Sequence, residues 1–306
     1  MQHEPLDGPD GAAVVSERQG QPGMDATVPS VEEGPPHVRS GRAERLTYAR
    51  YLRLNDILGS QHGLTEAHDE LQFIITHQVL ELWFKLLLFE LRTLRGAMQA
   101  MNLVTANRLV RRMHEILKNL IASFPLLETM RPADFLEIRS ELGSASGFQS
   151  RQFREIEFVS GVKDERYVRA HDGDPEGQAA LRASMEEPTL WDAFVGLLRR
   201  KGYGVESDAE IIRALIAIAK GDRHPALETL VEGLLEYDLL FAAWRSRHLL
   251  MVERMIGSKP GTGQKAVVEV VGNGYASMGS GAEYLKSTLA KRFFPLIWQA
   301  RTFIEK

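Results

Sequence analysis

Residues 65–102 read TEAHDELQFIITHQVLELWFKLLLFELRTLRGAMQAMN, and this stretch decides the fold class. Its apolar residues recur at spacings of three, four and seven, which places them along the sides of an α-helix. One such row consists of Leu71, Ile75, Leu82 and Leu86. Thr65, with acidic residues at positions 69 and 70, is typical of an N-terminal cap. The segment is long enough for the central helix of a bundle, so it predicts an all-α fold.

Other segments carry the same helical periodicity and are separated by turns that contain proline or glycine. They cover residues 106–123, 133–142, 177–200, 207–220, 225–256 and 281–304. The connections between them are mostly short, as in a helical bundle. Residues 264–278 break the pattern with a run of β-branched residues, and they predict a short strand, a hairpin or a loop.

The N-terminal part differs from the rest of the chain. Residues 1–42 are rich in proline, glycine, serine and acidic residues and lack the apolar period of either a helix or a strand. Ordering such a segment loses conformational entropy without burying apolar surface in return. We therefore predict a disordered tail over residues 1–42 and one helical domain over residues 43–306.

Charge and cysteine content restrict the classes of function. The chain of 306 residues has a formal net charge of -4 with both signs interspersed, which indicates neither a nucleic-acid nor an anionic membrane partner. Charged residues interrupt the apolar stretches before the roughly 20 residues that a membrane span needs, and the N-terminus lacks a secretory pattern. The absence of cysteine excludes disulfides, thiolate metal sites and iron–sulfur clusters. These features predict a cytoplasmic protein that acts on a small molecule.

Two histidines lie on apolar helix faces. His77 shares its face with Phe73 and Phe84, and His248 lies among aromatic residues and methionines in the segment 225–256. Two such inward imidazoles suit a flat, iron-bearing cofactor such as haem. Two independent core histidines are the alternative. The four-residue spacing of His77 and Glu81 also permits a non-haem metal site, although such bundles usually carry further Glu-x-x-His pairs.

Several polar segments are candidates for ligand contacts. Arg139 can hold a carboxylate through two parallel hydrogen bonds, or it can be an exposed surface arginine. The serine- and glycine-rich residues 143–150 can present hydroxyls to an anion, or they can form an ordinary loop. His171, in the stretch HDGD, is interpreted as part of a surface turn. The glycine-containing residues 261–263 and 279–281 predict mobile elements that close over a ligand, or linkers.

Several motifs resemble those of the tryptophan 2,3-dioxygenases in order and spacing, from about Leu46 to the C-terminus. They are Leu46-Thr47-Tyr48, Tyr51-Leu52, HDE (68–70), FIITHQ (73–78), ELW (81–83), Arg139, SASGFQSRQFR (144–154), WRSRH (244–248) and GTG (261–263). The resemblance implies a helical bundle around a pocket for ferrous haem b. It also implies cleavage of the indole ring of L-tryptophan with O2 to N-formyl-L-kynurenine, the first step of tryptophan degradation by the kynurenine pathway.

The resemblance assigns roles around the cofactor. His248 corresponds to the axial ligand of the haem iron, and Ser146 lies near a haem propionate in the family. His77 corresponds to the catalytic residue that hydrogen-bonds the indole N–H and orients the ring. The two inward histidines therefore take different roles.

The resemblance also assigns contacts with the substrate. Phe73 packs against the indole, Arg139 grips the carboxylate, and Thr262 contacts the ammonium and carboxylate end. Tyr48 and Tyr51 belong to a segment that reaches the active site of a neighbouring subunit. A homotetramer, a dimer of dimers with shared pockets, is therefore implied.

One segment departs from the family pattern. In the family, Gly-Thr-Gly passes almost directly into a Gly-Ser-Ser-Gly type stretch, whereas residues 264–278 separate Gly263 from residues 279–281 here. The inserted segment bears on how the pocket closes. A haem or gas sensor with the same fold is an alternative class, and Arg139 together with Thr262 discriminates, because a sensor need not recognise an amino-acid backbone.

Overall fold

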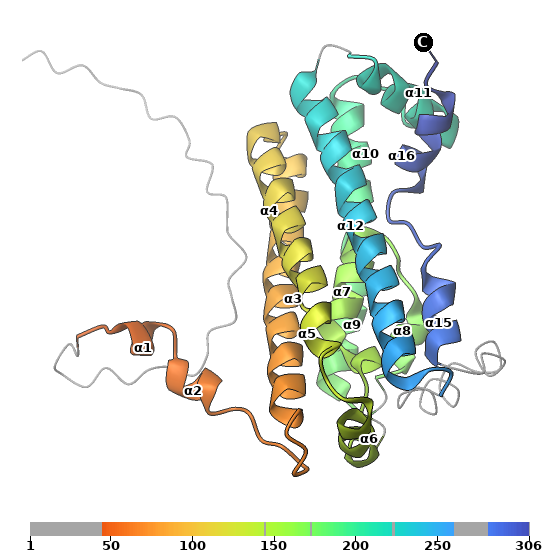
Figure 1. Ribbon diagram of the computed structural model, residues 1–306. Helices are drawn as coiled ribbons and strands as arrows, with labels where there is room; N and C mark the ends of the chain where they lie inside the picture. The colour runs from red at the N-terminus through yellow and green to blue at the C-terminus, as the bar shows by residue number, and fades with distance from the viewer. Residues whose placement is uncertain (1–44, 144, 172, 222–223, 260–280, 306) are drawn as a thin grey trace, which may run out of the picture. The chain divides into compact units, whose positions relative to one another are not determined.

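The computed structural model describes residues 45–143, 145–171, 173–221, 224–259 and 281–305, in which all regular secondary structure is helical. The α-helices are α1 (Tyr48–Tyr51), α2 (Leu54–Leu58), α3 (Glu70–Gln99), α4 (Leu103–Ala122), α5 (Phe124–Leu127), α6 (Pro132–Glu141), α7 (Arg151–Ser160), α8 (Glu165–Arg169), α9 (Pro175–Glu186), α10 (Leu190–Arg200), α11 (Asp208–Ala219), α12 (Pro225–Ile256), α15 (Gly281–Thr288) and α16 (Pro295–Ala300) (Figure 1). Two 3-10 turns are η1 (Gly147–Gln149) and η2 (Arg301–Phe303). The predicted all-α fold is confirmed.

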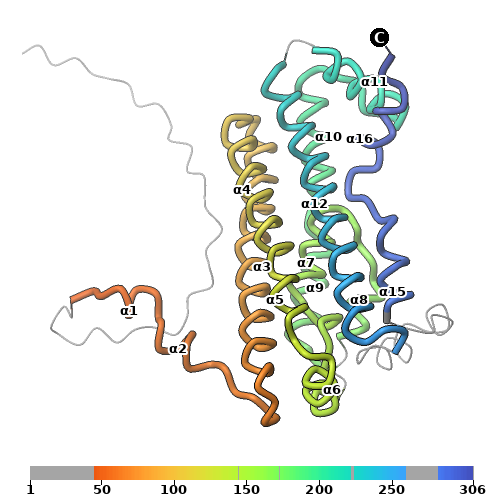
Figure 2. Tube along the Cα trace, viewed as in Figure 1, coloured from red at the N-terminus to blue at the C-terminus, as the bar shows by residue number. Residues whose placement is uncertain are grey.

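The chain forms two compact units, Met1–Asn55 and Asp56–Lys306. In the first unit the structure describes α1 and the beginning of α2; the tail predicted over residues 1–42 lies outside the described residues. The second unit is built around three long helices, with α4 packed against both α3 and α12 (Figure 2). Helices α7 and α10 cover α3, and α15 lies along α12. The bundle is closed by this second layer of shorter helices.

The buried and exposed sides of α3 both carry large apolar residues. The buried side includes Leu87, Leu91 and Leu94, which are fully buried in the main core. The row identified in the sequence lies on the other side, where Leu71, Ile75 and Leu82 are exposed and Leu86 is half-buried. Among the described helices, α3 alone is long and apolar enough to cross a membrane by length and composition. It packs against α4, α7 and α10 in the bundle.

The start of α3 differs from the predicted cap. The helix begins at Glu70 and its N-cap is Asp69, whose side chain makes no capping hydrogen bond. Thr65 instead donates from its backbone N–H and its hydroxyl to the Glu70 carboxylate, each over 2.7 Å. The assignment of Thr65 as the cap was therefore wrong, because its hydroxyl donates to the Glu70 carboxylate and does not accept from a backbone N–H of the first helical turn.

Two predicted helices are each divided at a proline. Residues 177–200 form α9 and α10, because Pro188 disfavours helical geometry at Glu187 and Thr189 then caps α10 together with Asp192. Residues 281–304 likewise form α15, α16 and η2, with the break before Pro295. By contrast, the helix predicted over residues 225–256 is confirmed with the same bounds in α12.

A buried carboxylate holds the chain at this second break. Asp238 of α12 is fully buried, and its Oδ2 accepts hydrogen bonds from the backbone N–H groups of Phe293 and Phe294 at 3.0 and 3.2 Å. The indole N–H of Trp298 donates to the same oxygen over 2.9 Å. Asp238 thus satisfies backbone donors that the broken helix leaves unpaired, and it anchors the C-terminal segment to α12.

Helices α4 and α12 approach closely at Gly233. A Cβ atom added at Gly233 would lie 2.5 Å from Cγ1 of Val110, which is buried. Because this space is already filled, we expect Gly233→Ala to lower the free energy of unfolding by about 1–3 kcal/mol. Gly196→Ala in α10 is the matched control, because nothing lies within 4 Å of its added Cβ. Chemical denaturation should show the control unchanged or stabilised by up to about 1 kcal/mol; equal effects of both substitutions would contradict the prediction.

Candidate functional site

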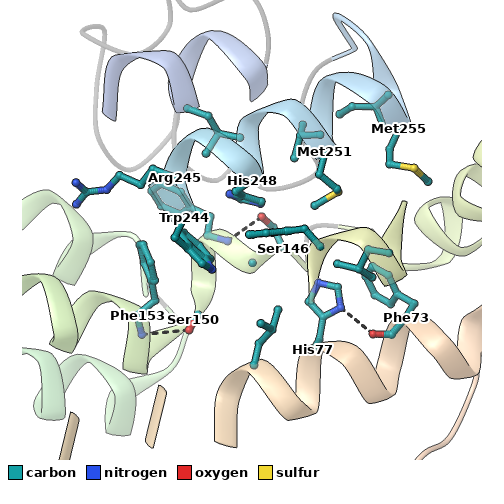
Figure 3. A pocket seen from close by; sticks show the side chains of 18 of the residues that line it. Phe73, His77, Ser146, Ser150, Phe153, Trp244, Arg245, His248, Met251 and Met255 are labelled. Atoms are coloured by element: carbon teal, nitrogen blue, oxygen red, sulfur yellow. Dashed lines mark hydrogen bonds between the residues drawn. The ribbon is translucent and has the colours of Figure 1, made fainter. Parts of the chain in front are cut away.

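A cavity of about 320 Å³ lies within the second unit, lined by residues of α3, α5, α6, α7, α12 and α15 and of the connections around α6. Most of the lining is apolar, as in pockets that bind organic ligands. The cavity brings together five residues predicted from the sequence: Phe73, His77, Arg139, Ser146 and His248. In Figure 3, the side chains of His248 and Met251, on α12, and the side chain of His77, on α3, project towards each other.

The tautomer of His77 follows from its hydrogen bond within α3. Its Nδ1 lies 2.7 Å from the carbonyl oxygen of Phe73, and a carbonyl oxygen can only accept, so Nδ1 carries the proton. The Phe73 ring also lies against the imidazole, with 4.1 Å between the ring centroids. Burial lowers the pKa of His77, which keeps the ring neutral at neutral pH. Its Nε2 is therefore a hydrogen-bond acceptor on a cavity-lining side chain.

His248, on α12, packs beside two aromatic rings. The Phe124 ring stacks on the imidazole with 5.8 Å between centroids, and the Trp244 ring lies 5.2 Å from it. Burial, with smaller electrostatic contributions from His77 and Arg154, lowers the pKa of His248 to about 4. The ring is thus unprotonated at neutral pH, which is the form in which histidine ligates a metal.

The remaining predicted residues of the cavity come from α6 and the connection after it. Arg139 is half-buried on α6 and lines the cavity. The neighbouring Phe135 ring packs 5.9 Å from that of Phe73. Ser146 caps η1: its Oγ accepts from the N–H of Phe148 over 3.1 Å. A hydroxyl that accepts in this way still carries a proton that it can donate.

A buried cluster of charges also lines the cavity, and the sequence analysis assigned it no role. The carboxylate of Glu157 binds Arg154 at 2.7 Å and Arg245 at 3.0 Å, and all three side chains are buried. Although burial raises the pKa of Glu157, the two guanidinium charges lower it more, so the carboxylate stays ionised. The trio carries a net positive charge. The Arg154–Glu157 spacing of three residues on a helix was readable from the sequence, whereas the contact with Arg245 requires the fold.

A further cavity-lining group has no partner in the described structure. The indole Nε1 of Trp244 is buried and makes no hydrogen bond there. A buried donor without a partner is unfavourable, which points to an acceptor supplied by a ligand. The sequence predicted Trp244 only as an apolar neighbour of His248 and as part of the WRSRH motif, and no spacing signal identifies this role.

Some predicted residues lie elsewhere. Tyr48 and Tyr51 are exposed on α1 in the first unit. Thr262 and the segment 264–278 lie outside the described residues, so the expected strand, hairpin or loop and the closing element remain predictions. Glu81 lines the cavity near His77, but its carboxylate accepts a hydrogen bond from Gln152 over 2.8 Å. In the described parts of the chain, no three His, Asp or Glu side chains are grouped as metal ligands.

The surface-turn interpretation of His171 was wrong. Its side chain is buried, with 4% of the residue exposed, and both ring nitrogens face backbone carbonyl oxygens. The polar composition of the HDGD stretch suggested a solvated turn. The imidazole is buried because it packs against the α6–α7 connection, where it faces the Gln149 carbonyl.

Comparison with known proteins identifies the family of the chain. The family model described as tryptophan 2,3-dioxygenase matches residues 32–211, more than half of the chain. A tryptophan 2,3-dioxygenase of Nocardioides sp. is 46% identical over 266 residues, which cover 84% of this chain and 94% of the relative. Those of Herpetosiphon aurantiacus and Caulobacter vibrioides are 40% and 36% identical, and each match covers 85% of this chain and nearly all of the relative. The chain therefore belongs to the haem-dependent tryptophan 2,3-dioxygenase family, whose reaction is the oxidation of tryptophan to N-formylkynurenine.

Proposed function

We propose that the cavity holds haem b beside L-tryptophan and that the chain opens the indole ring between C2 and C3 with O2, as a cytoplasmic homotetramer. The observation that supports this most is the pair of neutral histidines on α3 and α12 that line the same cavity. One imidazole serves as a metal ligand and the other as a hydrogen-bond acceptor. Two unrelated core histidines would not need to line one ligand-sized cavity.

The residues present fit a haem group. His248 offers a neutral imidazole for the iron, and aromatic residues and methionines of the lining suit the porphyrin faces. The net positive charge of the Arg154, Glu157 and Arg245 cluster suits anionic propionates, and Ser146 has a hydroxyl proton to donate near them. Bound ferrous haem supplies the dioxygen chemistry of the reaction.

The chain's own residues bind and orient the substrate. His77 accepts the indole N–H at Nε2, because its Nδ1 proton is already donated to the Phe73 carbonyl. The Phe73 ring packs against the indole, and its contact with Phe135 limits its movement. Arg139 binds the substrate carboxylate through two parallel hydrogen bonds. The mostly apolar lining excludes water and strengthens these polar contacts.

Three further residues complete the proposed site. Thr262 contacts the ammonium and carboxylate end of the substrate, in keeping with its place in the Gly-Thr-Gly motif. Tyr48 and Tyr51 contribute to the pocket of a neighbouring subunit, and their exposure on α1 leaves them available for that contact. Substrate binding and assembly are then linked through α1.

The exposed side of α3 is the proposed contact between subunits. Its outward apolar row comprises Leu71, Ile75, Leu82 and Phe89, which are 55%, 42%, 53% and 40% exposed. Such a row along a 30-residue helix suits a second copy of the same chain, because a symmetric contact pairs one apolar surface with itself.

We expect Leu82→Lys to disrupt the assembly, because it places a charge where the subunits would bury apolar surface. Light scattering coupled to gel filtration should show a smaller native mass. Val104→Lys is the matched control, since Val104 is 82% exposed at the start of α4 and lies off the row. An unchanged mass for Leu82→Lys would place the contact elsewhere.

An absorption spectrum of the reduced protein tests cofactor and substrate together. We expect a haem band that shifts when L-tryptophan is added, because the indole would lie against the haem pocket. L-Phenylalanine, which lacks the indole N–H, should shift it far less. Protein prepared with ample haem but without a haem band would refute the proposed cofactor site, and a band indifferent to L-tryptophan would refute the substrate site.

A further inference from the structure

The α6–α7 connection, residues 145–150, forms one wall of the cavity and is called the wall segment. Five of its residues line the cavity: Ala145, Ser146, Gly147, Phe148 and Ser150. Its hydrogen bonds are mostly local, such as those from the N–H groups of Phe148 and Phe153 to the hydroxyls of Ser146 and Ser150. These bonds give the segment its shape, but they do not tie it to more distant parts of the bundle.

His171 makes the distant connection. It follows α8, and its Nε2 lies 3.2 Å from the carbonyl oxygen of Gln149, 22 residues away in the chain. Within the described part of the chain, this is the one hydrogen bond that joins the wall segment to residues beyond 142–154. His171 is buried but is not among the residues that line the cavity. It therefore meets the wall from the side away from the cavity.

The other contacts of the wall segment with distant residues are less directional. The Phe148 ring packs 5.8 Å from that of Tyr167 and 5.4 Å from that of Tyr284. Aromatic contacts tolerate a range of offsets, whereas a hydrogen bond weakens steeply when its geometry is lost. The contact between His171 and Gln149 is thus suited to set the position of the wall.

We propose that His171 is a positioning residue: with Nε2 protonated, in that tautomer or as the imidazolium, it donates to the Gln149 carbonyl and holds the wall segment at the distance at which the cavity fits L-tryptophan. This inference rests on the proposed function, because Arg139 precedes the wall segment and Ser146 is part of it. A wall that moves outward loosens the substrate in its bound and reacting states alike. Such a loss raises KM and leaves kcat nearly unchanged.

The second ring nitrogen makes the test specific. Nδ1 of His171 lies 2.8 Å from the carbonyl oxygen of Tyr167, which is one turn earlier, in α8. Both acceptors are carbonyl oxygens, so a neutral imidazole donates to only one of them and the imidazolium to both. The amide nitrogen of asparagine can replace Nδ1, and that of glutamine can replace Nε2. His171→Gln therefore retains the hydrogen bond to the Gln149 carbonyl of the wall segment. His171→Asn retains only the hydrogen bond to the Tyr167 carbonyl.

The experiment compares the haem-loaded wild type, His171→Asn and His171→Gln. The wild type comes first, because failure to bind or oxidise L-tryptophan there would refute the proposed function itself. In His171→Asn we expect KM for L-tryptophan to rise about three- to tenfold, the effect of losing one hydrogen bond, with kcat within about twofold. His171→Gln should behave like the wild type. Titration of the haem band with L-tryptophan should show the same order of affinity without turnover.

Three outcomes would overturn the proposal. A normal KM in His171→Asn would mean that the bond to Gln149 does not position the wall. A raised KM in His171→Gln alone would transfer the role to the Tyr167 contact. Equal rises in both variants, with equal losses in thermal stability, would identify a general packing role.

Discussion

His248→Ala is expected to lose haem and, with it, tryptophan oxidation. The substitution removes the proposed ligand of the iron and leaves a space beside the Phe124 and Trp244 rings. Changes to groups that only orient a metal ligand already cost about 10- to 100-fold in metal affinity or activity, so removal of the ligand should cost more. Haem content per chain, measured from the absorption of the purified protein, is the primary readout.

Two controls separate ligation from folding. His62→Ala removes an exposed histidine that does not line the cavity and should retain haem. Imidazole added to His248→Ala can enter the vacated space and should restore part of the haem band. Circular dichroism should show the same helix content in all variants. Haem content equal to that of the wild type in His248→Ala would mean that another residue ligates the iron.

Arg139→Ala is expected to weaken the binding of L-tryptophan by about 2–5 kcal/mol, because it leaves the substrate carboxylate without its partner in the cavity. By the relation of about 1.4 kcal/mol per factor of ten, KM then rises by at least about 25-fold. Steady-state kinetics with L-tryptophan measure this change. The KM of Arg139→Lys should fall between those of the wild type and Arg139→Ala, because lysine keeps the positive charge but not the paired hydrogen-bond donors.

Tryptamine provides the matching change in the ligand, since it has the indole and the amine but no carboxylate. Wild type and Arg139→Ala should bind tryptamine with similar affinity, as judged by displacement of L-tryptophan. If Arg139→Ala weakened both compounds equally, the arginine would support the pocket without contacting the carboxylate. An unchanged KM for L-tryptophan would refute the contact altogether.

Helical periodicity predicted the parts of the site that depend on one helix at a time. The spacing around His77 and His248 placed each imidazole on an apolar face, and both line one cavity in the structure. Proline marks the breaks that helical periodicity does not show. Pro188 and Pro295 each follow a residue in non-helical geometry and divide a helix that periodicity alone had treated as continuous.

The sequence by itself determined the all-α class, the extent of α12 and the resemblance of its motifs to a known family, because these follow from residue types and their spacing along the chain. Only the tertiary structure decided which apolar side of α3 is buried, since Leu82 and Leu87 are both compatible with a core. It also joined Glu157 to Arg245 across 88 residues and brought His171 against Gln149. Such pairings depend on how helices pack, and the energy of a contact between distant residues has no signature in local periodicity.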